Sequence, residues 1–322
     1  MLQKKIKKNK NNIFFLTIAA SDSSGCAGIQ QDLKMAYDNG YWGLNVVTAV
    51  TSQSFNKAEN IEIIKEKTFK NQLEIIFNSF KISCIKIGII PKKSFATILK
   101  KYLKQINCPI VYDPVYKTSS GLLLIKDNPK DIFNILYPNV TVVTPNIPEY
   151  EFYFNDMNIS YKLQDTSYKC SGGACHRPFL DTSYNCSGGV HLRPFQIKNY
   201  RRGNPCGYPF LCDNHNPFSS IASEENLPHI NPAIYIKGGH GEEDSIKEYL
   251  IKNDKITNFE YEKKDWAFTR GTGCAFSSLL SMSLVDNDII TASQLARKYL
   301  VEYYDKVNKK PPSPTWQAKG EK

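Results

Sequence analysis

Short apolar segments alternate with amphipathic helical segments over most of this 322-residue chain. The apolar segments span residues 13–19, 44–51, 84–90, 110–113, 140–144 and 233–237, and they are rich in strand-forming residues. Between them, apolar residues recur at helical spacing, as in Phe69, Leu73, Ile76 and Phe77. Continuously apolar strands that alternate with helices predict an α/β fold, with a mostly parallel central sheet and helices on both faces.

Polar residues and glycines gather where these predicted strands end. Because the carboxyl ends of parallel strands share one edge of a sheet, where such sheets bind their ligands, these residues predict a single site. They are Asp22, Gly25, Gln53, Gly88, Asp113, Asn146, Glu149 and the run Lys237-Gly238-Gly239-His240.

The run Gly271-Thr272-Gly273-Cys274 precedes an apolar segment and predicts the start of a helix. Amides in the first turn of a helix have no intrahelical acceptor and bind anions such as phosphate. A thiol at this position is shifted toward thiolate, which can take a proton from a substrate hydroxyl. The alternative is an ordinary glycine-rich turn around a buried cysteine.

Two segments depart from the alternating pattern. Residues 1–12 are rich in Lys and Asn, so we expect a basic disordered tail before a single domain over residues 13–322. A repeat-containing insertion at about 160–230 interrupts this domain, in which residues 181–196 repeat residues 165–180. We expect an exposed loop without a chemical role. A zinc site is the alternative, with candidate ligands Cys170, Cys175, His176, Cys186 and His191.

The net charge of +10 comes partly from the lysines of the first ten residues, so it does not indicate a nucleic-acid-binding groove. No apolar stretch reaches the roughly 18 to 20 residues of a membrane span. Nine cysteines, an odd and scattered set, favour a reducing compartment, and we expect a cytoplasmic protein. A signal peptide ending near Ala20 is the alternative.

Several segments together resemble the hydroxymethylpyrimidine/phosphomethylpyrimidine kinase family of thiamine biosynthesis, within the ribokinase-like superfamily. These segments are residues 17–32, 47–53, 86–88, 113–115, 144–149, 237–240 and 271–274. The resemblance implies a kinase that uses ATP and Mg²⁺ to phosphorylate 4-amino-5-hydroxymethyl-2-methylpyrimidine or its monophosphate, and it implies a homo-oligomer. The alternatives are a pyridoxal kinase of the same family and a non-catalytic relative whose insertion binds a partner.

The resemblance also implies roles for single residues. The amides of Gly271, Thr272 and Gly273 would form the anion hole, Cys274 would be the base, and Glu149 would act on Mg²⁺ through water. As alternatives, Glu149 is a solvated glutamate at a helix start, and Asp32 is a carboxylate favoured by the helix dipole. Pyrimidine contacts are implied for Ala20, Ala27, Asp32, Gln53, Ile89 and Val115, and nucleotide contacts for Asp113, Asn146 and Lys237.

The chain departs from the family pattern at several positions. Ala20 and Cys26 stand where the family has glycine, which crowds the approach of the backbone to the substrate. Ser119 stands where the family has a lysine, so either Lys117 reaches in from a shifted loop or one phosphate contact is missing. Arg270 stands where relatives often have histidine, and its guanidinium favours a phosphorylated substrate.

Overall fold

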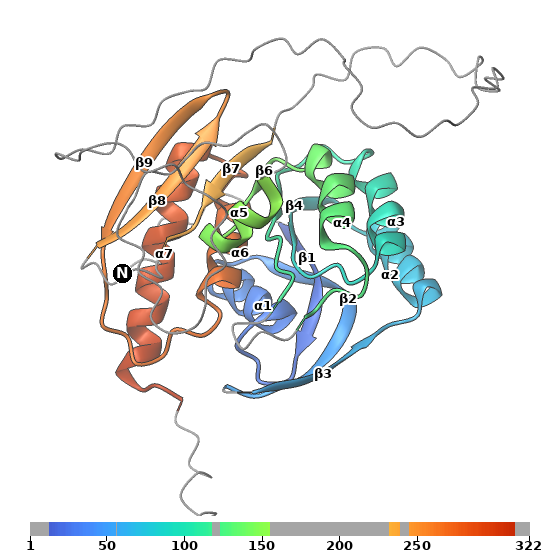
Figure 1. The fold of residues 1–322 in the computed structure, drawn as a ribbon, viewed down its shortest axis with the longest axis horizontal. Coiled ribbons are helices and arrows are strands. Elements are labelled where there is room, and N and C mark those ends of the chain that lie inside the picture. Colours follow the sequence, from blue (N-terminus) through green and yellow to red (C-terminus); the bar gives the residue numbers. More distant parts are fainter. Residues whose placement is uncertain (1–12, 56, 118–122, 155–231, 239–244, 313–322) are drawn as a thin grey trace, which may run out of the picture. The chain divides into compact units, whose positions relative to one another are not determined.

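A computed structural model describes residues 13–55, 57–117, 123–154, 232–238 and 245–312. The predicted tail over residues 1–12 and the predicted insertion at about 160–230 lie outside the described residues. Within them, one nine-stranded sheet has the order β3-β2-β1-β4-β5-β6-β7-β8-β9, and Figure 1 shows it running through the domain.

Six neighbouring strands of this sheet are parallel. Each corresponds to one of the six apolar segments of the sequence, because a strand covered on both faces has no side that favours polar residues. The predicted α/β fold is confirmed. The strands are β1 (Phe14–Asp22), β2 (Trp42–Gln53), β4 (Ile82–Ile87), β5 (Ile110–Tyr112), β6 (Val142–Val143) and β7 (Ala233–Ile236).

Antiparallel strands extend the sheet at both ends. β3 (Ala58–Ile63) pairs with β2, whereas β8 (Ser245–Lys252) and β9 (Lys255–Glu262) continue beyond β7. Asn253 and Asp254 join β8 to β9, and both have positive φ, as a tight two-residue hairpin turn requires. The sequence prediction did not include these three strands.

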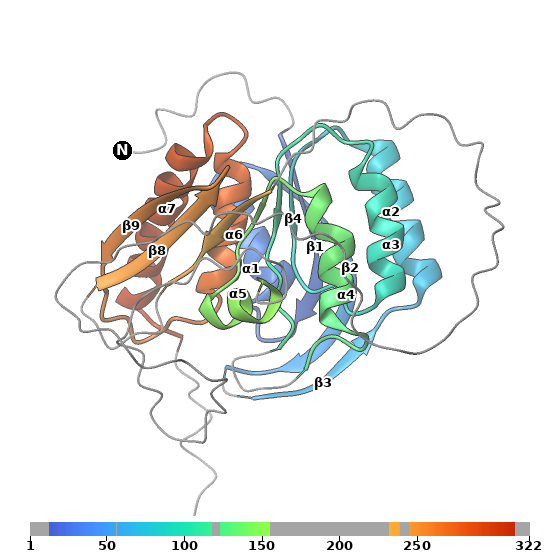
Figure 2. The same cartoon turned by 45° about the horizontal axis from the view of Figure 1, so that its top comes forward.

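Helices cover both faces of the sheet, as Figure 2 shows. One face carries α1 (Gly28–Asp38), α6 (Thr272–Ser283) and α7 (Ile289–Lys309), and the other carries α2 (Glu66–Ser79), α3 (Lys93–Leu103) and α4 (Pro129–Leu136). The short α5 (Ile147–Phe154) follows β6. None of the described helices is both long and apolar enough to cross a membrane.

The core beneath α6 determines where this helix begins. Phe276, Leu279 and Leu280 are buried against the sheet, and the ring of Phe276 lies 4.7 Å from that of Tyr235 in β7. Burial of these side chains favours this seating of the helix on the sheet. Its first turn then lies beside the loop that follows β1, where the predicted site residues gather.

Candidate active site

The first turn of α6 is built around Gly271, as the sequence predicts. Gly271 has φ +78°, and a Cβ at this position would lie 1.7 Å from the carbonyl oxygen of Cys26. The first hydrogen bond within the helix runs from the N–H of Ala275 to the oxygen of Gly271, at 2.9 Å. The amides of Thr272, Gly273 and Cys274 precede it and have no intrahelical acceptor, so they form a candidate anion hole.

The loop between β1 and α1 forms the other side of this contact. The carboxylate of Asp22 accepts hydrogen bonds from the amides of Cys26, at 3.2 Å, and Ala27, at 2.8 Å. Gly28 has φ +55°, and a Cβ there would lie 2.2 Å from the oxygen of Ala20. Asp22 therefore shapes the loop, and the predicted substrate residues Ala20 and Ala27 belong to the segment that reaches α6.

The thiol of Cys274 lies between α6 and this loop. The backbone N–H of Gly28 hydrogen bonds to its sulfur. Burial raises the pKa of the thiol to about 11; Lys86 lowers this pKa, whereas Asp32 and Asp113 raise it. The sequence led us to expect a thiol shifted toward thiolate, and the structure shows the opposite shift, because burial outweighs the nearby positive charge.

Asp113 and Lys237 meet at the carboxyl edge of the sheet, after β5 and β7. The ammonium of Lys237 lies 2.6 Å from Oδ1 of Asp113 and 3.4 Å from where a Cβ on Gly273 would be. Oδ2 of Asp113 is buried and has no hydrogen-bond partner within the described part of the chain. The structure thus brings these two predicted nucleotide residues to the start of α6.

Asn146 and Glu149 form a reciprocal cap at the start of α5. The amide of Asn146 donates to Oε2 of Glu149 at 2.9 Å, and the amide of Glu149 donates to Oδ1 of Asn146 at 2.8 Å. Glu149 is only 5% exposed, so it is not a solvated glutamate. Burial raises its pKa to about 7; Lys237 and Lys117 lower this pKa, and Asp113 raises it.

The loop after Lys117 was predicted to differ from the family pattern. Ser119 lies outside the described residues, whereas Lys117 is close enough to Glu149 for its charge to act on that carboxylate. The ammonium of Lys117 also lies 5.4 Å from the ring centre of Tyr116. These contacts place a positive charge beside the predicted nucleotide residues.

Asp32 lies beneath the site, with 0% of its surface exposed. Its carboxylate accepts hydrogen bonds from Lys86 at 3.0 Å, Thr17 at 2.6 Å and Ser278 at 2.8 Å. Lys86 and Ser278 received no role from the sequence. The four serines of α6, in an otherwise apolar helix, were the signal that this helix faces polar partners.

The remaining predicted substrate residues end the strands at the same edge. Gln53 is the last residue of β2, and two residues later the ring of Phe55 lies 5.5 Å from that of Phe268, in the segment that enters α6. This contact brings the segment after β2 next to the segment that precedes α6. Ile89 and Val115 follow β4 and β5, and both are half-buried.

Helix α7 holds the segment before α6, which the sequence did not indicate. The hydroxyl of Tyr304 donates to the oxygen of Arg270 at 2.5 Å. The side-chain amide of Asn308 donates to the oxygen of Phe268 at 3.0 Å, and the amide of Phe268 donates back at 2.8 Å. The backbone of the anion loop is therefore fixed on its α7 side.

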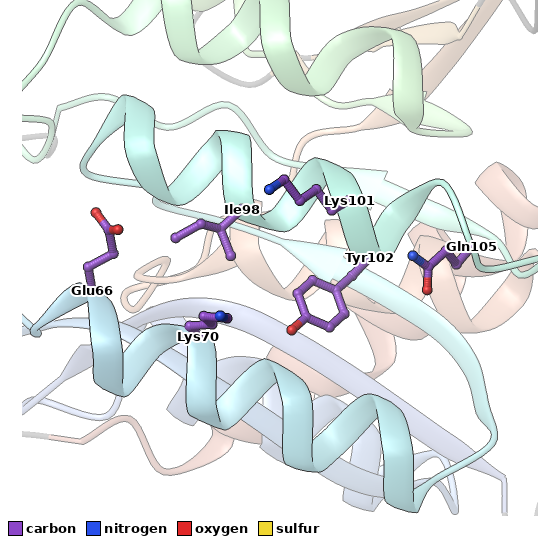
Figure 3. A pocket seen from close by; sticks show the side chains of 6 residues that line it. All are labelled: Glu66, Lys70, Ile98, Lys101, Tyr102 and Gln105. Atoms are coloured by element: carbon purple, nitrogen blue, oxygen red, sulfur yellow. The ribbon is translucent and has the colours of Figure 1, made fainter. Parts of the chain in front are cut away.

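A surface groove of about 450 Å³ lies elsewhere, between α2 and α3 on the opposite face of the sheet. Figure 3 shows its lining, and none of the predicted site residues belongs to it. The lining residues are Glu66, Lys70, Ile98, Lys101, Tyr102 and Gln105. In the described ranges no three His, Cys, Asp or Glu side chains cluster as metal ligands, and the zinc alternative falls in the insertion, outside them.

The sequence matches a family model and known proteins over most of its length. A model of the phosphomethylpyrimidine kinase family matches residues 22–169 and 219–310. A Staphylococcus aureus (strain Mu50) hydroxymethylpyrimidine/phosphomethylpyrimidine kinase is 27% identical over 289 residues, 88% of this chain and 85% of that protein.

Two solved structures show a similar fold. The Clostridium difficile 630 phosphomethylpyrimidine kinase has a TM-score of 0.57 at 24% identity, covering 91% of this chain and 99% of that chain. A Staphylococcus aureus pyridoxal kinase in complex with AMP-PCP has a TM-score of 0.62 at 17% identity, covering 91% and 88%. The predicted ribokinase-like fold is confirmed. Since the family model matches well over half of the sequence, the chain belongs to the phosphomethylpyrimidine kinase family.

Proposed function

We propose that this protein transfers the γ-phosphoryl group of ATP to the hydroxymethyl oxygen of 4-amino-5-hydroxymethyl-2-methylpyrimidine, and then to the monophosphate so formed. Its family is one of phosphotransferases. The observation that carries the proposal is the start of α6, where amides without an intrahelical acceptor, the thiol of Cys274 and the Asp113–Lys237 pair meet. ATP use is supported by the related pyridoxal kinase solved with AMP-PCP.

In the proposed reaction the substrate oxygen bonds to the γ-phosphorus while the bond from that phosphorus to the ADP oxygen breaks. Charge on the transferring group needs fixed hydrogen-bond donors more than covalent help. The amides of Thr272, Gly273 and Cys274 supply donors, and Lys237 adds a positive charge beside Gly273. The packing of Gly271 against Cys26 holds these donors in place before substrate binds.

The proton of the substrate hydroxyl goes to the sulfur of Cys274 in this scheme. With a pKa raised to about 11, Cys274 is mostly thiol at neutral pH in the free protein. Its thiolate form is favoured by the hydrogen bond from Gly28 and by the charge of Lys86. The small thiolate fraction is the form that accepts the proton.

The residues of the site fit a magnesium ion. Oδ2 of Asp113 is buried and lacks a hydrogen-bond partner in the described ranges, and the carboxylate of Glu149 is buried nearby. Carboxylate oxygens are ligands that Mg²⁺ prefers. Bound there, the ion would neutralise charge on the phosphates of ATP, and Lys237 would balance the two carboxylates in its absence.

The pyrimidine is proposed to lie between the strand ends and the loop after β1. Gln53 offers both a donor and an acceptor for the edge of an aminopyrimidine, and Ile89 and Val115 offer apolar surface. Arg270 precedes the anion loop and suits a monophosphate. Asp32, being fully buried, would act on the substrate through its neighbours.

The test is an ATP-dependent assay of purified protein with the pyrimidine alcohol, its monophosphate and pyridoxal as separate substrates. We expect kcat/KM for the pyrimidine alcohol to exceed that for pyridoxal by at least about tenfold. A preference for pyridoxal would replace the substrate assignment while keeping the reaction class. A cytoplasmic location and self-association stay predictions from the sequence.

A further inference from the structure

A buried polar cluster joins four elements beneath the proposed site. The ammonium of Lys86, in β4, lies 3.0 Å from both carboxylate oxygens of Asp32, in α1. Thr17 of β1 donates to the same carboxylate at 2.6 Å, and Ser278 of α6 donates at 2.8 Å. Lys86 is 1% exposed and Asp32 is 0% exposed. The cluster is therefore a complete ion pair with no access to solvent.

Stability alone does not explain such a pair. Removing two charges from water costs about as much as their attraction returns, and apolar side chains of similar volume serve as well. A buried ion pair that connects a strand to two helices is therefore expected to have a role besides stability, and we look for this role among the neighbouring groups.

The position of the cluster relative to Cys274 indicates this role. Residues four apart on a helix lie on the same face, one turn from each other. Gly28 and Asp32 are four positions apart in α1, and Cys274 and Ser278 are four positions apart in α6. The Gly28–Cys274 and Asp32–Ser278 hydrogen bonds are consecutive contacts between the two helices. The carboxylate that holds Lys86 is thus one helical turn, along both helices, from the contact that holds the sulfur.

Among the described residues, charged and titratable groups act on Cys274 from several elements. They are Lys86 from β4, Asp32 from α1, Asp113 after β5, Lys237 after β7 and Tyr304 from α7. Burial raises the pKa of Cys274; among the charges, Lys86 opposes this most, whereas Asp32 and Asp113 add to it.

We propose that Lys86 is a positioning residue whose buried ammonium, held in place by Asp32, stabilises the thiolate of Cys274. The proposal rests on the role of Cys274 as the base of the proposed kinase reaction. Asp32 acts by holding Lys86 in place, and Ser278 joins the carboxylate of Asp32 to α6. The ion pair then places a fixed positive charge behind the anion loop, on the side of the site away from solvent.

The test is a pH titration of Cys274 in the full-length protein without ligands. Cysteine labelled with ¹³C at Cβ reports the thiolate fraction directly by NMR, and Cys274→Ser identifies the signal. In the wild-type chain the thiol pKa is raised to about 11, so the titration is followed through that pH range. Loss of a nearby opposite charge shifts a pKa by about 1–3 units, so Lys86→Met should raise the titration midpoint by about 1 pH unit or more and lower the thiolate fraction at any pH within the range.

Two further variants separate charge from structure. Lys86→Arg keeps the positive charge and should restore most of the wild-type thiolate fraction. Ser278→Ala removes one hydrogen bond but no charge, and it should titrate within about 0.5 pH units of wild type. If Lys86→Met does not fold, the double variant Asp32→Asn with Lys86→Met leaves no buried charge unpaired. It should still titrate at higher pH than wild type, because Lys86 opposes the shift more than Asp32 adds to it.

A folded Lys86→Met protein, or a folded double variant, that titrates like wild type would overturn the proposal. So would a Ser278→Ala shift as large as that of Lys86→Met, because it would show that disturbed packing moves the thiol. The kinase assay is a separate measurement. An inactive wild-type protein would refute the proposed function, whereas the titration would still decide the role of Lys86.

Discussion

Gly271 offers the sharpest test of the anion loop. Its φ of +78° lies in the left-handed region, and a Cβ would lie 1.7 Å from the oxygen of Cys26, where real contacts stay above 3.0 Å. In Gly271→Ala the loop after β1 and the start of α6 must therefore move apart by more than 1 Å. The same loops carry the thiol of Cys274 and its partner Gly28.

Two costs can be calculated separately. A left-handed conformation costs a residue with a side chain about 1–2 kcal/mol, which lowers Tm by about 2–4 °C per kcal/mol in a domain of this size class. A displacement of about 1 Å in a group that positions a reaction costs about 10²-fold in rate. We therefore expect Gly271→Ala to lose several degrees in Tm and about 10²-fold in kcat.

Gly40 provides a matched control. Its φ is +74°, and a Cβ there would meet nothing within 4 Å. Gly40→Ala should lose about 1–2 kcal/mol of stability through the same backbone strain, with kcat unchanged. Thermal unfolding and the ATP-dependent assay measure both quantities. Wild-type kcat in Gly271→Ala, or an equal fall of kcat in both variants, would refute the argument that this contact positions the anion hole.

Three further predictions concern the thiol of Cys274, the carboxylate of Glu149 and the repeat-containing segment. Cys274→Ser should lower kcat by about 10²-fold with KM nearly unchanged, and wild-type turnover would exclude the thiolate as base. Because the pKa of Glu149 is raised from 4.5 to about 7, the folded chain binds an extra proton between these pH values, and its free energy of unfolding falls as the pH rises through them. Urea unfolding in EDTA at several pH values should show this fall in the wild-type chain but not in Glu149→Gln. The same pH profile in both proteins would contradict the prediction. Deleting residues 165–196 should leave kinase activity largely intact, and a chain that no longer folds would show that the segment belongs to the core.

The parallel part of the fold was predictable because a strand that is buried on both faces has a continuous apolar sequence. β1, β2, β4, β5, β6 and β7 all read as apolar runs, and their order with the intervening helices implied the sheet. β3, β8 and β9 lie at the ends of the sheet, and their sequences carry charged residues inside the strand, such as Glu62 in β3, Lys247 in β8 and Glu260 in β9. Without a continuous apolar run these strands were missed, although Asn253-Asp254 was a usable turn signal.

The convergence of the predicted residues on one edge of the sheet followed from topology. Asp113 and Lys237 are 124 positions apart in the chain, yet they form an ion pair because β5 and β7 end at the same edge of the sheet. Contacts that depend on how deeply each side chain is buried could not be predicted from topology. Asp32 and Gln53 were given the same role, and only the structure separates a fully buried carboxylate from a half-buried amide.

The protonation of Cys274 shows why depth matters for chemistry as well. Its place at a helix N-terminus predicts a lowered pKa, and that placement is correct. Burial acts in the opposite direction, and its size depends on how α1, α6 and α7 pack around the sulfur, which no local pattern reveals. A base in this position therefore needs a compensating positive charge. Lys86 supplies this charge from a strand 188 positions earlier in the chain, where its ammonium is buried against the carboxylate of Asp32, so no pattern in the sequence around Cys274 indicates it.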